Sequence, residues 1–151
     1  MGSTEVQVAI CYEEATLTRV IEAGQIQSSE VIQQAQADMA YFRDTWMGTT
    51  PYLRQDGKPV LLNFGPQHLR NAQNWQSVFT VFSTPPVFVT EDNRLAPASD
   101  GAFPWPPMWA SGGGTLTPAR LGQYSDDLYA NASLWPIPVA GACPGCHHLH
   151  Q

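Results

Sequence analysis

The chain has 151 residues and a mass of 16.6 kDa, which suits one domain with a substantial core. Lys and Arg total 7 against 13 Asp and Glu, and the formal charge of -6 excludes a basic surface for a phosphate backbone, so we expect no nucleic-acid partner. No apolar run approaches the roughly 18 residues of a membrane span, and the first residues lack the features of a signal peptide. We therefore expect no membrane partner, and the compartment stays open.

The first elements expected along the chain are a strand and a helix. Residues 6–12, VQVAICY, are apolar and β-branched, as in a strand buried on both faces, and Cys11 is expected to be a small buried hydrophobe within it. Ser28 and Ser29 are natural N-caps for a helix that runs to about Trp46. Polar side chains follow the strand directly.

Three further elements are expected before residue 91. Gly57 forms a turn ahead of a second strand at residues 59–64. A second helix is predicted over residues 68–82, with its aromatic side chains facing inward, and residues 85–90 are predicted to be a third strand. Each strand is again followed by polar residues.

Residues 95–114 form a loop rich in proline, glycine and tryptophan, of a length that is unusual unless it is functional. Thr117 as N-cap and Pro118 as first helical residue start a third helix, and residues 135–142 are expected to form a fourth strand. This alternation of strands and helices predicts an α/β fold with a parallel sheet of right-handed β-α-β units. Ligands meet such sheets at the carboxyl ends of the strands.

Five segments resemble, in the same order, those of glycoside hydrolases of families 71 and 99. They are ICYEE (10–14), GKPVLLNFGPQ (57–67), EDNR (91–94), GAFPWPPMW (101–109) and PGCHH (144–148). The resemblance implies a (β/α)8 TIM-type barrel that cleaves glycosidic bonds in a polysaccharide or glycan of the α-glucan or α-mannan type. It implies an oligosaccharide or polysaccharide as partner and no cofactor.

The resemblance covers part of a barrel. A closed barrel needs about 250 residues, so residues 1–151 are expected to be a single partial (β/α) barrel domain, truncated at both ends. Such relatives carry their acid and nucleophile or base in a later W-N-[DE]-x-x-E-x-T-like motif, which this sequence lacks, so we expect the catalytic pair to lie outside the chain. Open sheet edges would favour self-association.

The candidate catalytic carboxylates are Glu13 and Asp92, for which substrate contact is expected ahead of direct catalysis. Glycosidases need two carboxyls about 5 Å apart for retention or about 6.5 to 9.5 Å apart for inversion. Glu13 and Glu14 are neighbours on a strand end and point in opposite directions, so only one is expected to face a cleft. Glu13 could instead pair with Glu91 or Asp92 across strands.

Sugar contacts are expected from aromatic and polar side chains near the strand ends. Trp105 and Trp109, with Phe103, offer faces for sugar rings, although anchoring of the loop explains them equally well. Asn63 and Gln67 suit hydroxyl recognition, and loop capping remains an alternative. The expected sugar contacts are Tyr12, Glu14, Asn63, Gln67, Glu91, Trp105, Trp109 and His147.

The chain ends in GACPGCHHLHQ, where Cys143, Cys146 and His147 have the C-x-x-C-H spacing of haem attachment. Haem attachment needs an export signal and a haem-enclosing fold, so we expect no haem. Zinc could bind the two thiols with neighbouring histidines, but no second pair organises such a site, and no metal site is assigned. The alternatives to a hydrolase fragment are a noncatalytic carbohydrate-binding or degenerate barrel and a small zinc-binding protein.

Overall fold

The computed structural model of the chain describes residues 6–91, 95, 98–105, 117–132 and 137–138. Its elements are β1 (Ile10–Glu13), α1 (Ala15–Glu22), η1 (Ser28–Glu30), α2 (Val31–Thr45), β2 (Arg54–Gln55), β3 (Lys58–Phe64), α3 (Ala72–Val78), η2 (Phe79–Val81), β4 (Val87–Glu91), β5 (Gly101–Phe103), α4 (Pro118–Ala132) and β6 (Ile137–Pro138). No helix in these ranges is both long and apolar enough to cross a membrane.

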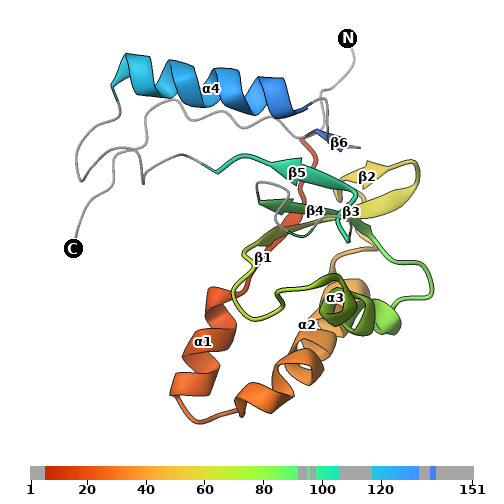
Figure 1. The fold of residues 1–151 in the computed structure, drawn as a ribbon. Helices are drawn as coiled ribbons and strands as arrows, with labels where there is room; N and C mark the ends of the chain where they lie inside the picture. Colours follow the sequence, from red (N-terminus) through yellow and green to blue (C-terminus); the bar gives the residue numbers. More distant parts are fainter. Residues whose placement is uncertain (1–5, 92–94, 96–97, 106–116, 133–136, 139–151) are drawn as a thin grey trace.

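One sheet organises the fold, and its strands β1, β3, β4, β5 and β6 lie side by side in the order of the chain (Figure 1). All four pairings along this path are parallel, which confirms the expected α/β fold with a parallel sheet. The short strand β2 adds an antiparallel hairpin to β3. Its turn has positive φ at Asp56 (50°) and Gly57 (79°), as a two-residue hairpin with a mirror-image turn requires.

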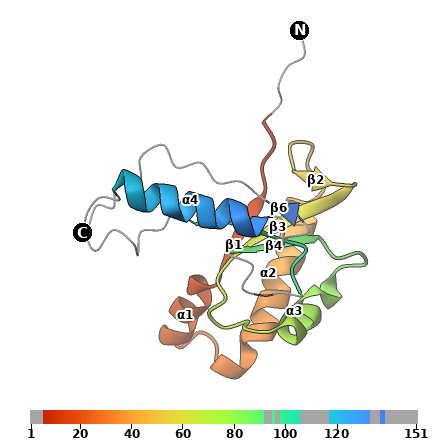
Figure 2. The same cartoon turned by 45° about the horizontal axis from the view of Figure 1, so that its top comes forward.

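Three helices, α1, α2 and α3, cover one face of the sheet, while α4 lies on the other side in both views (Figures 1 and 2). The main core fills the space between the sheet and the first three helices. Its buried members include Leu17, Ala35, Met39, Phe42, Leu61, Trp75, Val78 and Phe88. Rings of Trp75 and Phe88 lie 4.4 Å apart between centroids, so α3 packs directly on β4.

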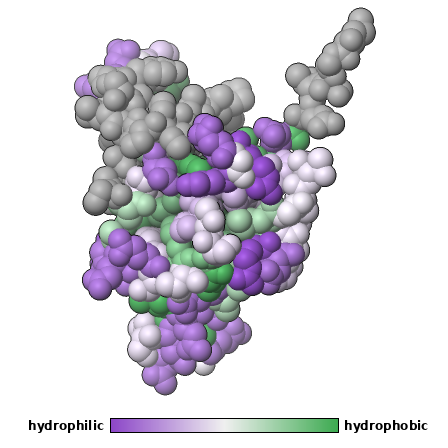
Figure 3. Space-filling model, turned by 90° about the vertical axis from the view of Figure 1, so that its right-hand side faces the viewer, coloured by the Kyte–Doolittle hydropathy of each residue, from purple (hydrophilic) through white to green (hydrophobic). Residues whose placement is uncertain are grey.

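A smaller apolar cluster lies on the opposite face of the sheet and consists of Val60, Val87, Val89 and Phe103. The two clusters follow from the alternation of side chains along each strand, because every second residue points to the same face. Seen from one side, hydrophobic residues reach the surface across the middle of the molecule among hydrophilic ones (Figure 3). The sheet is thus apolar on both faces, as parallel sheets usually are.

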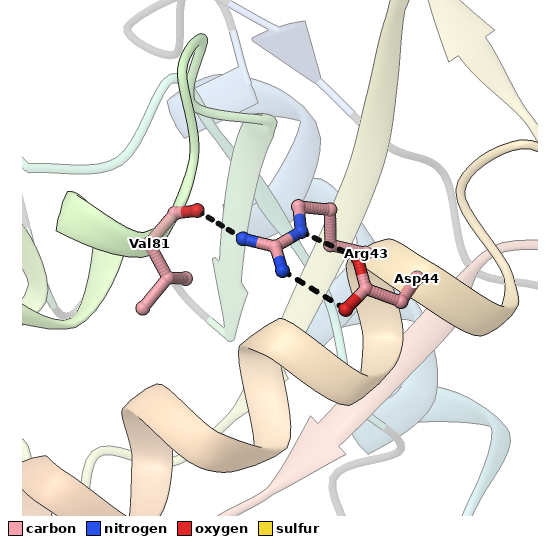
Figure 4. A network of polar contacts seen from close by, with 3 residues as sticks. All are labelled: Arg43, Asp44 and Val81. Carbon is pink, nitrogen blue, oxygen red and sulfur yellow. Dashed lines mark hydrogen bonds and ion pairs between the residues drawn. The ribbon is translucent and has the colours of Figure 1, made fainter.

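The end of α2 is held to η2 by a single arginine (Figure 4). Arg43 Nη1 donates to the carbonyl oxygen of Val81 at 2.5 Å, while Nε and Nη2 donate to the two carboxylate oxygens of Asp44 at 2.7 and 2.9 Å. The ion pair is solvent-exposed and adds little by itself. The bond to Val81 ties the last residue of η2 to the end of α2.

The expectation of a first strand buried on both faces is wrong. Val6 is 81% and Val8 50% exposed, and Cys11, expected to be buried, is exposed as well. Among the described residues β1 pairs with β3 alone, so it is an edge strand whose far side no neighbouring strand covers. The apolar run therefore predicted a strand here correctly, but it did not predict how much of the strand is buried.

Helix α1 and strand β5, like the short strand β2, were not expected. Helix α1 begins directly after β1, where the hydroxyl of Thr16 donates to the carbonyl oxygen of Glu13 at 2.7 Å, and it buries Leu17 against the core. Strand β5 lies inside the segment that was expected to be a continuous loop, and it pairs with β4 through Gly101, Ala102 and Phe103. The helix expected from Thr117 is confirmed, with the Thr117 hydroxyl accepting from the backbone nitrogen of Arg120 at 3.3 Å.

Candidate functional site

The carboxyl ends of four strands carry alternating acidic and aromatic residues in one row across the sheet. Glu13 is the register partner of Phe64, and Glu91 is the register partner of Phe103. Phe64 lies beside Glu91, because Asn63 and Thr90 form the preceding pair. Register partners in a parallel sheet share a face, so we call Glu13, Phe64, Glu91 and Phe103 the acidic-aromatic row.

The row lies on the face opposite α1, α2 and α3. Its two carboxylate residues are two strand spacings apart, which places their Cα atoms roughly 10 Å from each other. Glu13 is exposed, whereas Glu91 is only 6% exposed. Glu13 and Glu91 thus offer one accessible and one sheltered carboxyl across an aromatic ring.

The thiol of Cys11 lies close enough to Glu13 and Glu91 for the charges of both carboxylates to affect its pKa. Although the residue is exposed, loss of water around its thiol raises the pKa to about 11. A hydrogen bond with the backbone of Phe64 opposes this shift, while the negative charges of Glu13 and Glu91 add to it. Both carboxylates therefore contribute negative potential at the same thiol.

Trp105 extends the row toward solvent. Its ring lies 4.4 Å from that of Phe64 between centroids, with 55° between the planes, and the residue is 47% exposed. The hydroxyl of Tyr124 in α4 donates to the carbonyl oxygen of Trp105 at 2.8 Å and holds this segment. Trp105 thus adds a partly exposed aromatic face at the end of the sheet that carries Glu13 and Glu91.

Glu14 has a different environment from its neighbour Glu13. It is fully buried at 0% exposure, and its Oε2 accepts from the backbone nitrogens of Gln67, His68 and Leu69 at 2.9, 2.8 and 2.9 Å. Its Oε1 accepts from Nδ2 of Asn63 at 3.0 Å. The expected division of Glu13 and Glu14 between two sides of the strand is confirmed, and Glu14 is enclosed by the chain itself.

Like Glu14, two further expected sugar contacts, Tyr12 and Asn63, lie on the helix-covered side, away from the acidic-aromatic row. The hydroxyl of Tyr12 donates to Oδ2 of Asp38 in α2 at 2.8 Å. Burial of Tyr12, and then the charge of Asp38, raise the pKa of the Tyr12 hydroxyl well above its usual value. Asn63, the register partner of Tyr12, is 0% exposed.

The remaining candidates are only partly described. Gln67 is half-buried in the loop after β3. Asp92, Trp109 and His147 lie outside the described residues, as do Cys143 and Cys146 with the terminal histidines. In the described part of the chain no three His, Cys, Asp or Glu side chains gather as metal ligands would.

Sequence reasoning named Phe103 beside Trp105 and Trp109 as part of an aromatic platform, but it missed Phe64 as a member of the site. The usable signal for Phe64 was the alternation of side chains, because Phe64 shares a face with Leu62, the apolar residue two positions before it in the strand. The register between strands, which joins these residues into a row, has no such local signal. Searches against protein-family models, curated proteins and solved structures gave no match for the chain.

Proposed function

We propose that this chain is part of a glycoside hydrolase of the family 71 and family 99 type, acting on glycosidic bonds of an α-glucan or α-mannan type polysaccharide or glycan. The observation that carries the proposal is the acidic-aromatic row with the Trp105 ring packed against Phe64. The row is the place where the sugar binds. The resemblance of five sequence segments supplies the substrate class.

The topology of β1, β3 and β4 supports a barrel as the parent architecture, whereas α4, on the other side of the sheet, departs from the barrel pattern. Strand order follows chain order, and the connections between β1, β3 and β4 place α1, α2 and α3 on one face. A doubly wound sheet reverses its strand order at the ligand site, whereas a (β/α)8 barrel does not. In a barrel, the acidic-aromatic row would face the interior at the carboxyl end, where barrel enzymes bind substrate.

The residues of the row have separate roles in this proposal. Trp105 stacks on the apolar face of a sugar ring, and Glu13 accepts hydrogen bonds from hydroxyl groups. Glu91, sheltered beside Phe103, adds negative charge that stabilises an oxocarbenium-like transition state. Bond cleavage itself needs the acid and the nucleophile or base that the resemblance assigns to a motif absent from these 151 residues.

The test is titration of the protein with short neutral α-linked gluco- and manno-oligosaccharides by calorimetry. Trp105→Ala should weaken binding about two- to tenfold, the value of one ring-stacking contact. Trp46→Ala is a matched control, because Trp46 is 46% exposed and Trp105 47%, while Trp46 ends α2 away from the row. Trp46→Ala should leave binding unchanged.

Two outcomes contradict the proposal: no binding of any α-linked oligosaccharide, and equal losses in the two tryptophan variants. Release of reducing sugar in the same samples distinguishes the alternatives. Binding without release is the behaviour of a noncatalytic carbohydrate-binding fragment. Release that Glu13→Gln abolishes would instead make Glu13 a catalytic residue.

A further inference from the structure

We infer that residues 65–69, the loop after β3, form a carboxylate-binding nest whose occupant is the chain's own Glu14. A nest is a concave run of backbone amides that binds an anion. Glu14 is then a positioning residue, which fixes the end of β3 and makes no contact with sugar. The consequence for sugar binding rests on the proposed function, whereas the nest itself rests on geometry alone.

Three successive amides converge on one oxygen atom. The backbone nitrogens of Gln67, His68 and Leu69 all donate to Glu14 Oε2 within 2.8 to 2.9 Å. The other oxygen, Oε1, accepts from the Asn63 side chain at 3.0 Å. All four donors are neutral amides, so the charge of the carboxylate is met by dipoles and not by a cation.

Complete burial makes this arrangement specific for a carboxylate. A buried ionised group is tolerated only when hydrogen bonds replace its water, and Glu14 is 0% exposed. The site offers four donors and therefore needs an acceptor at both oxygen positions. A glutamine at position 14 would direct its NH2 group at the backbone amides or at Asn63 Nδ2, leaving donor facing donor.

Gly65 shows that the loop is shaped around the carboxylate. A Cβ atom on Gly65 would lie 2.9 Å from Glu14 Oε1, closer than real Cβ atoms come, and 3.1 Å from Glu14 Cδ, tighter than most real contacts. It would also lie 3.3 Å from Asn63 Nδ2. The close approach of backbone and carboxylate therefore requires glycine here, and alanine would displace the carboxylate while leaving its charge in place.

The far side of the loop is fixed as well. The carbonyl oxygen of Leu69 accepts from Trp75 Nε1 at 3.0 Å, and His68 Nε2 shares a hydrogen bond of 2.8 Å with the hydroxyl of Thr18 in α1. Phe64, which precedes the loop, contacts Trp105. Loosening the nest would therefore free the ring of Phe64, against which Trp105 packs at the end of the acidic-aromatic row.

The experiment measures hydrogen exchange at the amides of Gln67, His68 and Leu69, with no sugar present. Glu14→Ala should speed exchange at these three amides about ten- to a hundredfold, because each loses a charge-assisted bond. Addition of formate or acetate should restore protection in Glu14→Ala in a saturable manner. Glu13→Ala, the matched control on the opposite face, should neither speed exchange nor respond to formate or acetate.

Glu14→Gln keeps the shape but not the two acceptor oxygens, and it should reproduce most of the faster exchange. Wild-type protection in Glu14→Gln, or failure of both formate and acetate to restore Glu14→Ala, would overturn the inference. If Glu14→Ala does not fold, Gly65→Ala provides the test, since it should speed the same three amides, and unchanged exchange there would likewise overturn it. Intact protection with no sugar binding would defeat only the proposed function.

Discussion

Thr90 and Asn63 are register partners on β4 and β3, and both are fully buried at 0% exposure. Oγ1 of Thr90 and Oδ1 of Asn63 have no hydrogen-bond partner within the described part of the chain. A buried polar atom without a hydrogen-bond partner lowers the free energy of unfolding, because it has lost its bonds to water and gained none in the protein. The pair lies on the face of the sheet that the helices cover, and Asn63 also donates to Glu14 in the nest.

At this scale we expect Thr90→Val to leave the free energy of unfolding unchanged or to raise it by up to about 1 kcal/mol, because valine fills the same space without an unpaired hydroxyl. Thr18→Val is the comparison, since it removes the bond to His68 and should lower the free energy of unfolding by about 1 kcal/mol. Urea unfolding of both variants measures the difference. A loss in Thr90→Val as large as that in Thr18→Val would show that the Thr90 hydroxyl has a partner, such as an internal water.

At the scale of elements, one side chain substitutes for backbone pairing between β1 and β3. The hydroxyl of Tyr52 accepts from the backbone nitrogen of Ile10 at 3.0 Å and donates to the carbonyl oxygen of Val60 at 2.6 Å. Tyr52 is 1% exposed, so water cannot replace these bonds. The edge strand β1 is thereby held to the sheet at its amino-terminal end.

Tyr52→Phe should lower the free energy of unfolding by about 1 to 3 kcal/mol, because it leaves a buried amide or carbonyl without its partner. Hydrogen exchange at the Ile10 amide should accelerate in the same variant. Tyr41→Phe is the control, since Tyr41 is 66% exposed and its substitution should change neither quantity. Equal stability of Tyr52→Phe and the unsubstituted protein would mean that backbone pairing alone holds β1.

Elements with strong local signals were predictable. The helix expected over residues 28–46 matches η1 with α2, and the strands expected at 59–64 and 85–90 match β3 and β4. The three-residue strand β5 was missed, because glycine, alanine and one aromatic residue carry no strand pattern without a partner strand beside them. Propensity acts locally, whereas β5 depends on its pairing with β4.

The same limit applied to the site. Glu13, Glu91 and Trp105 could be proposed from their places after strands or in an aromatic loop. Side-chain alternation within one segment shows that Tyr12 and Glu13 face opposite sides of the sheet. It does not show which side the helices cover, because that depends on the packing of the whole sheet.

At the scale of the whole molecule, three groups make stability depend on alkaline pH. Desolvation raises the pKa of Cys11 to about 11, and burial raises the pKa of Tyr12 and Tyr52 above their usual value. Above the pKa values of the unfolded chain, about 8.5 for Cys and about 10 for Tyr, the folded state then binds more protons than the unfolded state. Stability is full below that range and is lost as pH rises through the folded values.

We therefore expect the urea midpoint to fall steadily as the pH is raised from about 8 to about 11, values that bracket the unfolded pKa of these groups. Tyr12→Phe should be less stable at the lower pH, because it loses the bond to Asp38, yet its midpoint should fall less steeply. Unfolding curves at matched ionic strength measure both slopes. A midpoint that rises with pH, or identical slopes in the two proteins, would contradict the assignment.

Glu13 and Glu14 are adjacent in the chain but belong to opposite sides of the sheet, one exposed and one in the nest. Substitutions and changes of length in Ile10–Glu13 therefore have unequal effects during evolution. A substitution removes one contribution, whereas insertion or deletion of a single residue reverses every side chain that follows it. Such a change of length would turn the position of Glu13 toward the nest and the carboxylate of Glu14 toward solvent. Descendants of this sequence can vary the residues of this strand more freely than its length.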